Sequence, residues 1–528
     1  MFRALDIIKL KVMALCLLPV ILLNGCLQIG GGIIRMDLQA PVINLDPQFA
    51  TDPTAQMLLL NLLEGLVVQS PTGELISGCA ESWDISADGL VYTFHLRDGL
   101  YWADEQQTPL VAGDFVFGLS RLFSSPPSPY AADFAAIKGT EQSISGNKFS
   151  LGIRATDTQT LVITLERPDP MLLTRLSGTA ALPCRREFFE DCRGRYGLEQ
   201  AFILSNGPFV LKEWDNAKQI LLEKNVKYHS PDKTSADSIS FYIGREKNKA
   251  QFADNKSQLI TLPQPELSQI KRNDVSLYPA GSTIWCIVIN TKDPVWRLPV
   301  LRQALALSTD RKALSAVLAN GLSPIEVFLP EGVLLGESLL SELTDISVPV
   351  NYSPDEAHRL FTLGLEMLEL DVIPNLTILA PDSSEQVQYL GALQQSWQRE
   401  LALYPRIQRL PDDSLLRRVA DGDFQAALLP FAAQSAQAAD ILEPFAQANH
   451  AEYRNPIYNS FIAEARKAAD VGDMARLYAQ AQRLLLADAP VIPLYEEKAY
   501  CVVSDNIEGL WVYPLGGRLY FNAKNVYE

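Results

Sequence analysis

The sequence predicts an ordered α/β protein of two or three domains. At 528 residues the chain is longer than one hydrophobic core usually supports. Its composition, 48% hydrophobic and 20% charged, is that of a globular protein. Both main periodicities are present, because apolar residues alternate along Val91–Leu96, as in a half-buried strand, and recur at helical spacing along Thr54–Leu66.

Further elements follow in chain order, each predicted from its local pattern. An Asp-Gly turn precedes the strand Val91–Leu96. Asp114, placed where a carboxylate meets the positive end of a helix, marks a helix beginning near Gly113. A capping box with proline at the first helical position marks another helix at Ser353–Glu356. The remaining strands are expected at Ile33–Leu38, Leu161–Leu165 and Phe424–Phe431.

The charge of the chain bears on its partners. The formal net charge is −17. A chain this acidic is repelled by phosphate backbones, so nucleic acid is not an expected partner. The same field favours the approach of cationic ligands, although salt weakens it.

The N-terminus has the pattern of an export signal. Three basic residues precede the apolar stretch Val12–Leu23, which is too short to span a bilayer comfortably. The stretch ends in Leu23-Asn24-Gly25-Cys26, which resembles a bacterial lipobox. We therefore expect residues 1–25 to be a lipoprotein signal peptide and Cys26 to be lipidated, anchoring the protein on the extracytoplasmic side of a bacterial membrane. The alternative is a plain secretory signal with an incidental cysteine.

Short motifs from about Leu38 to the C-terminus carry a family resemblance. They include Leu45-Asp46-Pro47, Glu64-Gly65-Leu66, Ala80-Glu81-Ser82-Trp83, Asn206-Gly207-Pro208-Phe209 and Ala489-Pro490-Val491-Ile492-Pro493-Leu494-Tyr495. In this order and spacing they resemble the oligopeptide- and dipeptide-binding lipoproteins of peptide ABC importers, the family 5 extracellular solute-binding proteins.

The resemblance implies a fold and a domain layout. The fold is the two-lobed periplasmic-binding-protein fold (type II, Venus flytrap), with an extra domain inserted in the first lobe. Lobe I is expected in three pieces, at 27–67, 179–283 and 491–528. The inserted domain II is expected at 68–178, and lobe II (domain III) at 284–490.

The segment Gln434–Phe445 is the strongest candidate for the ligand site. Small residues, Ala438 among them, follow the predicted strand and would let an extended ligand approach the backbone. Asp440 lies just beyond and could meet a cation at the end of that ligand. From the residues alone, an ordinary turn or helix N-cap residue is the favoured interpretation of Asp440. The resemblance implies that it pairs with the α-amino group of a peptide, and no basic residue for the peptide carboxylate stands in Gln434–Gln437.

Three aromatic residues are expected near the ligand cleft. Trp285 lies at the predicted crossing between the lobes, with packing in that neck as the alternative. Tyr130 is in a proline-rich loop that could cover the cleft, with surface packing as the alternative. Phe431 precedes the Asp440 segment, and burial in the core is its alternative.

Several kinds of chemistry are not indicated. The sequence contains no phosphate-binding G-x-x-x-x-G-K-[ST] loop, no H-E-x-x-H and no G-x-S-x-G, so neither the ATPase of a transporter nor two common hydrolase classes are expected. The four histidines are far apart and no CxxC occurs, so we expect no catalytic residue, metal or cofactor. Cys184 and Cys192 are close enough in sequence to pair, but nothing in the sequence shows that they do.

Together these features predict a binding protein and not an enzyme. The protein is expected to capture peptides between its lobes as a monomer, close around them, and deliver them to a membrane ABC permease with its ATPase. Two alternatives remain. The same scaffold could bind a nonpeptide ligand such as a nickel chelate, heme, an opine or an oligosaccharide. It could also be a surface adhesin or chaperone-like lipoprotein that does not transport.

Overall fold

The structure is a computed structural model of the chain. It describes residues 32–38, 41–144, 150–234, 236–243, 248–254, 256–319, 321–347, 352–382, 384–433, 435–505, 507 and 509–521. The predicted signal peptide and Cys26 lie outside these residues. Within them, no helix is both long enough and apolar enough to cross a membrane.

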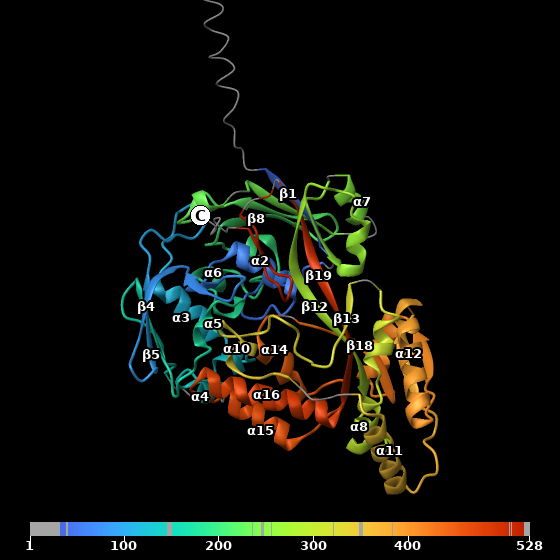
Figure 1. The fold of residues 1–528 in the computed structure, drawn as a ribbon. Coiled ribbons are helices and arrows are strands. Elements are labelled where there is room, and N and C mark those ends of the chain that lie inside the picture. Colours follow the sequence, from blue (N-terminus) through green and yellow to red (C-terminus); the bar gives the residue numbers. More distant parts are fainter. Residues whose placement is uncertain are drawn as a thin grey trace, which may run out of the picture.

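One large mixed sheet runs through both lobes (Figure 1). Lobe I contributes β11, β1, β10, β9 and β8, and lobe II contributes β16, β17 and β18. The described strands, in sheet order, are β17 (Arg406–Leu410), β16 (Thr377–Pro381), β18 (Ala426–Ala432), β12 (Val275–Ile289), β19 (Val491–Ser504), β11 (Leu259–Pro263), β1 (Ile33–Leu38), β10 (Ser238–Ile243), β9 (Gln219–Lys224) and β8 (Phe209–Asp215), with β13 (Leu322–Pro324) pairing to β19 beside this path.

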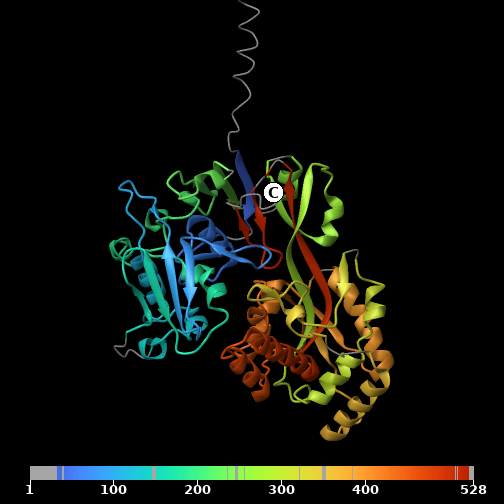
Figure 2. The same ribbon diagram turned by 60° about the vertical axis from the view of Figure 1, so that its left-hand side comes forward.

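Two long strands, β12 and β19, connect the lobes (Figures 1 and 2). They pair antiparallel from Val275 opposite Ser504 to Val288 opposite Val491. The register shifts after Pro279 and again after Trp285. Such bulges bend and twist a two-stranded ribbon, so the ribbon can turn from one lobe into the other. The predicted boundary at residues 283 and 284 falls inside β12.

A separate antiparallel sheet forms the inserted domain, at the left in Figure 2. Trp102, 1% exposed, packs behind this sheet, and its indole N–H donates to the Asp114 carboxylate over 3.0 Å. The domain shares one hydrophobic core with lobe I. Its elements are β4 (Ala80–Ile85), β5 (Val91–Leu96), α3 (Ala112–Arg121), α4 (Thr140–Ile144), β6 (Ile153–Ala155), β7 (Thr160–Thr164) and α5 (Leu172–Leu176), with α6 (Arg186–Asp191) following.

Lobe II buries the two faces of its part of the sheet in two cores. Cys286 and Val288 of β12 face one core, while Ile287 and Ile289 face the other, as the period of two requires. Helices α14 to α16 cover the first face. The helices of this lobe are α8 (Pro299–Leu307), α9 (Arg311–Ser315), α10 (Leu340–Leu343), α11 (Pro354–Leu368), α12 (Ser384–Leu401), α13 (Asp412–Ala420), α14 (Ala438–Leu442), α15 (Pro456–Ala465) and α16 (Val471–Asp488).

Short elements complete lobe I and the contacts between lobes. Helix α2 is followed by a hairpin, a second hairpin belongs to lobe II, and a third lies near the C-terminus. The elements are α2 (Pro53–Leu62), β2 (Val67–Gln69), β3 (Leu75–Ser77), α7 (Asn248–Ala253), β14 (Leu334–Leu335), β15 (Ser338–Leu339), β20 (Trp511–Val512) and β21 (Leu519–Tyr520).

Most predicted elements are confirmed, with small shifts at their ends. Strands β1 and β5 have the predicted bounds, and α11 begins at Pro354. The Ser353 side chain, however, makes no capping hydrogen bond. Helix α2 ends at Leu62, because Leu63 is already extended, with φ −128°. The cysteines that the structure describes are all free and buried: Cys79, Cys184, Cys192, Cys286 and Cys501.

Candidate functional site

A cavity of about 790 Å³ lies between the lobes and the inserted domain, and we call it the interlobe cavity. Its walls come from elements far apart in the sequence. Lobe I contributes Gln56, Thr179 and Arg518, the inserted domain Gln69 and the region from Tyr130 to Gly178, and lobe II residues of α14, α15 and α16. A ligand that fills this cavity would therefore contact both lobes and the inserted domain.

Asp440 stands in the first turn of α14 and is exposed to the interlobe cavity. The Ser435 hydroxyl donates a hydrogen bond to its carboxylate, and no cation lies within ion-pair distance of it among the described residues. Enclosure by protein raises the pKa of Asp440 above its ordinary value, against the opposing effects of the Ser435 bond and the Arg518 charge. The carboxylate is thus available to a cationic ligand.

Two other charged groups of the same cavity, Glu443 and Arg175, are already paired. Glu443 forms an ion pair with Arg466 and accepts a hydrogen bond of 2.7 Å from the Tyr478 hydroxyl. Arg175 is paired with the buried Asp169. In each pair the two charges neutralise each other. Asp440, three residues before the paired Glu443, has no counter-ion among the described residues.

Asp133 is a second carboxylate of the interlobe cavity with no ion pair among the described residues. Loss of water around it raises its pKa to about 6, with the charges of Asp440 and Glu443 adding to that effect and those of Arg175 and Arg466 opposing it. Because it lies close enough to Asp440 to feel its charge, the two make this part of the cavity attractive to a cation.

Tyr130 lines the same cavity, but its hydroxyl is already used. It donates to the Ala50 carbonyl over 2.6 Å and accepts from the Gln56 amide over 2.8 Å. Burial raises the pKa of Tyr130, so the phenol stays neutral. Its ring, and not its hydroxyl, is the part left to face a ligand.

The small-residue segment before Asp440 is fastened to the β14–β15 hairpin. Leu334 N–H donates to the Ala436 carbonyl over 2.6 Å, and the Gln437 side chain bonds both backbone groups of Gly336 at 3.0 and 3.2 Å. Gly336 has φ +67°, a conformation that glycine adopts without strain. Gln69, at the start of the inserted domain, also donates to Gly336, so this hairpin of lobe II contacts the inserted domain.

A second cavity of about 510 Å³ adjoins the first, and Asp440 lines both. Three aromatic rings stand in its wall, Phe328, Phe431 and Phe445, with centroids 5.2 to 5.9 Å apart. We call it the phenylalanine pocket. It could take an apolar group of a ligand whose charged end is held at Asp440.

The remaining predicted site residues lie elsewhere. Ala438, the first residue of α14, is fully buried and lines neither cavity. Trp285 lines a third pocket, stacks on Tyr495 with ring centroids 6.1 Å apart, and donates to the Glu497 carboxylate over 3.0 Å. Among the described residues, no group of three or more His, Cys, Asp or Glu side chains is placed to hold a metal ion.

A sequence model of the family described as "Bacterial extracellular solute-binding proteins, family 5 Middle" matches residues 74–453. The chain belongs to this family. Its two lobes, its inserted domain and the cavity between them are therefore those of a family 5 solute-binding protein. Proteins of this family are extracytoplasmic and bind solutes.

Curated relatives of this family 5 protein extend over most of the chain. The dipeptide-binding protein DppE of Bacillus subtilis is 24% identical over 92% of this chain and 91% of its own length. The periplasmic oligopeptide-binding protein OppA of Escherichia coli is 26% identical, covering 86% and 85%. The "Probable deoxycholate-binding periplasmic protein YgiS" of Escherichia coli is also 26% identical, covering 88% of each.

Solved structures confirm the fold. The substrate-binding domain of an oligopeptide ABC transporter from Bacillus anthracis superposes with a TM-score of 0.73 at 23% identity, covering 93% of this chain and 98% of that one. Listeria monocytogenes OppA bound to peptide gives 0.72 at 23% identity with the same coverage. The predicted two-lobed type II fold with its additional domain is therefore correct.

Sequence reasoning missed two charged residues of the interlobe cavity in this family 5 protein. Asp133 and Arg518 each line it together with Asp440, yet both are distant from Asp440 along the chain. Neither stands in a motif. What marks them is that neither has a counter-ion among the described residues, and pairing is a property of the folded chain.

Proposed function

We propose that this family 5 protein captures peptides in the interlobe cavity and delivers them to a membrane ABC permease. Relatives named for dipeptide and oligopeptide binding support this, as does the family as a whole. The observation that carries the proposal is Asp440, a carboxylate that faces the cavity and has no cationic partner among the described residues.

Asp440 would hold the α-ammonium group of the peptide. A charge that leaves bulk water is stable only when it is paired, so an enclosed carboxylate favours a ligand that brings a cation. Asp133 strengthens the same attraction, and the net charge of −17 raises the local concentration of cationic ligands. The Tyr130 ring and Phe431 would contact the ligand from the walls of the two adjoining cavities.

Binding would not depend on most peptide side chains. A peptide brings its own N–H and C=O groups, which can pair with backbone of either wall whatever its sequence. Side chains in a cavity of this size can be solvated by water, which keeps specificity broad. The phenylalanine pocket adds a preference for an apolar group next to the charged terminus. The protein acts in this account by binding alone, as a monomer and without catalysis.

A ligand that touches both lobes would favour their closed arrangement, which the permease would recognise. The bulged ribbon of β12 and β19 is the element that would bend. Small-angle scattering checks this: the radius of gyration should fall when a binding peptide is added. An unchanged radius with proven binding would exclude closure upon binding.

The proposal includes a lipid anchor at Cys26, which would keep the protein beside its permease. Two or three acyl chains are needed for stable attachment to a membrane. Metabolic labelling with a fatty acid should tag the natural chain and leave Cys26→Ala untagged. Equal labelling of both would exclude this anchor.

Native mass spectrometry of gently purified protein tests the function directly. The expected result is a heterogeneous set of bound peptides, released on denaturation and identified by fragmentation. An empty protein that also fails to take up any member of a synthetic library of two- to five-residue peptides would contradict peptide capture.

A second candidate ligand is an amphipathic nonpeptide acid. The relative named for deoxycholate binding favours it, and so does the apolar wall formed by Phe328, Phe431 and Phe445. Deoxycholate added to the same experiment distinguishes the two. Uptake of deoxycholate and of no peptide would select this candidate.

A further inference from the structure

Arg518 is a cation of the interlobe cavity with no counter-ion among the residues that the structure describes. Its Nε–H group is buried and has no hydrogen-bond partner in that part of the chain. A guanidinium carries five N–H donors and keeps its charge at every accessible pH. An enclosed donor without an acceptor costs free energy, so this side chain is suited to an acceptor that comes with a ligand.

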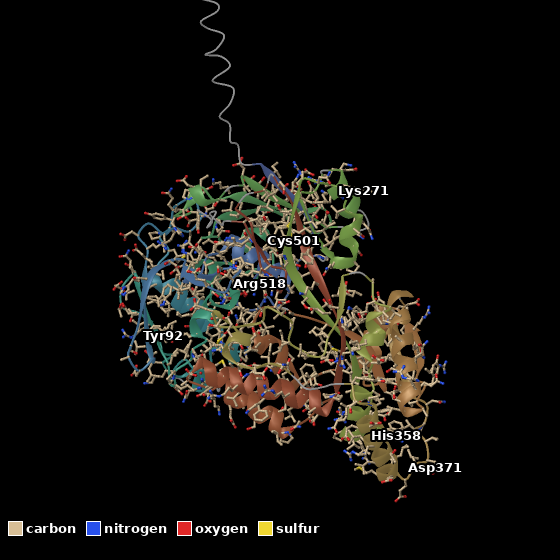
Figure 3. All side chains as sticks on the ribbon, in the orientation of Figure 1. Tyr92, Lys271, His358, Asp371, Cys501 and Arg518 are labelled. Carbon is tan, nitrogen blue, oxygen red and sulfur yellow. The ribbon has the colours of Figure 1, made fainter. Side chains whose placement is uncertain are left out.

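The structure around Arg518 holds it in place without neutralising it. Arg518 lies in the turn between β20 and β21, which the Tyr513 N–H closes by donating to the Arg518 carbonyl over 3.0 Å. Its guanidinium carbon is 5.6 Å from the centroid of the Tyr513 ring. The Tyr513 hydroxyl in turn donates to the Gln69 carbonyl over 2.5 Å. Figure 3 shows Arg518 near the middle of the molecule.

The other arginines of the cavity differ in pairing or position. Arg175 and Arg466 have carboxylate partners, Asp169 and Glu443. Arg167 has no ion pair among the described residues either, but it belongs to the inserted domain.

Arg518 differs from Asp440 in the sign of its charge and in the lobe to which it belongs. It is on the wall from lobe I, whereas Asp440 is on the wall from lobe II, and no ion pair joins them. The charge of Arg518 nevertheless acts on the groups around the proposed ammonium site. It opposes the rise in the pKa of both Asp440 and Tyr130.

We propose that Arg518 is the binding site for a carboxylate of the ligand. This rests on the proposed function, in which the cationic end of a peptide lies at Asp440. A planar guanidinium binds a carboxylate through two parallel hydrogen bonds, which an uncharged amide cannot replace. The carboxylate is the C-terminus of a peptide or, for the second candidate ligand, the acid group of a molecule such as deoxycholate.

The two charges are on different lobes, and this has a consequence for closure. A ligand that carries both a cation and a carboxylate pairs with both walls, so its binding free energy favours the arrangement that brings the walls together. A ligand with only one charge leaves Asp440 or Arg518 unpaired. The protein therefore selects zwitterionic ligands over singly charged ones of the same size.

The test is competition between matched peptides, measured by native mass spectrometry. An equimolar library of two- to five-residue peptides is offered with free C-termini and, in equal amount, as C-terminal amides. The proteins are the natural chain, Arg518→Gln, Arg518→Lys and Arg167→Gln. Arg167→Gln tests the rival assignment, because it removes the other arginine of the same cavity that has no ion pair among the described residues; a ratio lost in Arg167→Gln and kept in Arg518→Gln would overturn the inference. Thermal unfolding checks that each variant folds.

The natural chain should retain free acids over amides by about 10- to 100-fold, the range for a hydrogen bond to a charged group. Arg518→Gln should bring that ratio close to one, Arg518→Lys should keep part of it, and Arg167→Gln all of it. Equal retention of acids and amides by the natural chain would overturn the inference, as would an undiminished ratio in Arg518→Gln. Should Arg518→Gln not fold, the natural chain and Arg518→Lys decide.

Failure of the proposed function is distinguishable from failure of this inference. If no peptide is retained, peptide capture is wrong, and deoxycholate with its methyl ester becomes the probe. Binding of the acid alone, lost in Arg518→Gln, would still support a carboxylate site at Arg518. Equal binding of acid and ester would overturn it, and binding of no probe would overturn both proposals.

Discussion

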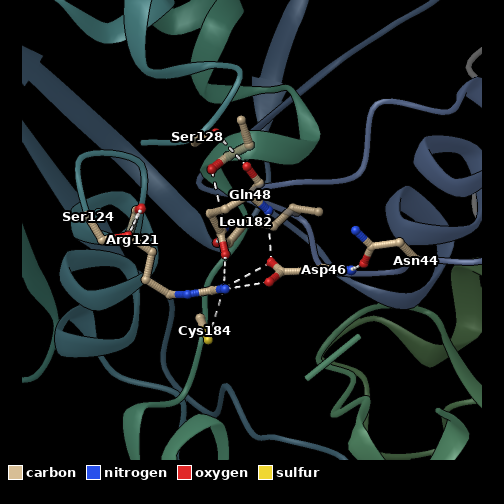
Figure 4. A network of polar contacts seen from close by, with 9 residues as sticks. Asn44, Asp46, Gln48, Arg121, Ser124, Ser128, Leu182 and Cys184 are labelled. Atoms are coloured by element: carbon tan, nitrogen blue, oxygen red, sulfur yellow. Dashed lines mark hydrogen bonds and ion pairs between the residues drawn. The ribbon is translucent and has the colours of Figure 1, made fainter. Parts of the chain in front are cut away.

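Asp46 of lobe I with Arg121 of the inserted domain, and Asp440 with Arg518 in the interlobe cavity, are the same two residue types in opposite situations. Asp46 and Arg121 are buried, with exposed fractions of 9% and 7%. Both Nη atoms of the Arg121 guanidinium bond the Asp46 carboxylate, and Arg121 Nη1 lies 3.0 Å from Asp46 Oδ1. Gln48 accepts a further bond from Arg121, as Figure 4 shows. Asp440 and Arg518 face a cavity and remain apart.

The difference separates structural charges from binding charges. Around Asp46 both Nη groups of Arg121 bond acceptors within the chain, so this network fixes how α3 sits against lobe I. In the cavity Glu443 and Arg466 pair with each other, whereas Asp440 receives a hydrogen bond from Ser435 but no cation from the described residues. A charged group without a partner on a concave surface can be paired by a ligand of opposite charge.

The largest effect on stability should come from the paired side of this comparison. Asp46→Asn leaves Arg121 buried beside a neutral amide, which should lower the free energy of unfolding by about 3–5 kcal/mol. Urea unfolding followed by circular dichroism measures it.

Asp440→Asn is the control for Asp46→Asn. Because enclosure raises the pKa of Asp440, its ionised form is disfavoured in the fold, and removing that charge should leave stability unchanged or slightly higher. Similar losses in both variants would remove the distinction between the two pairs.

Tyr130→Phe tests a residue whose hydroxyl stabilises the fold and whose ring lines the interlobe cavity. Its hydroxyl bonds Ala50 and Gln56, so its loss should lower the free energy of unfolding by about 0.5–1.5 kcal/mol. Peptide affinity should change little, because the ring stays in the cavity wall. Calorimetry and urea unfolding separate the two. An affinity loss beyond about tenfold would place the hydroxyl against the ligand instead.

The sequence predicted the elements better than it predicted their pairing. Strands β1 and β5 and the start of α11 follow from local periodicity and capping patterns, which act within a few residues. The continuous ribbon of β12 and β19 joins residues about 200 apart, and no local pattern determines which strands become neighbours.

The site shows the same limit. Asp440 could be proposed from a small-residue segment and a family resemblance, and Tyr130 does share its cavity. Arg518 carried no signal in the sequence, because what distinguishes it is a buried Nε–H group with no hydrogen-bond partner among the described residues of the folded chain. Trp285 was proposed from its place at the lobe crossing, but in a strand the side one residue faces depends on register, and it lines a different pocket.

The smallest effect expected concerns pH. Asp133 has a pKa of about 6, above its ordinary value, and it faces Arg175, Asp440, Glu443 and Arg466. Since the raised pKa favours the protonated form in the fold, ionisation of Asp133 costs stability as pH rises through 6, while protonation below 6 removes a charge that attracts cations. Peptide affinity should therefore fall up to about fivefold between pH 7.5 and 5.

Asp133→Asn isolates that contribution. Its affinity should be less dependent on pH than that of the natural chain, in calorimetry across the same interval. Tighter binding at pH 5, or an identical pH profile in the variant, would show that Asp133 has no part in attracting the ligand.

The central claim is that Asp440 pairs with the ammonium group of a peptide. Asp440→Asn keeps the shape of the side chain but removes its charge, and losing one partner of an enclosed charge pair costs about 2–5 kcal/mol, or about 30- to 3000-fold in affinity. Acetylating the N-terminus of the peptide removes the other partner. Calorimetry on the four combinations of protein and peptide measures the coupling between the two changes. The account predicts that each change alone weakens binding by a similar factor and that the second adds little to the first. Two harmless changes, or two that add independently, would contradict it.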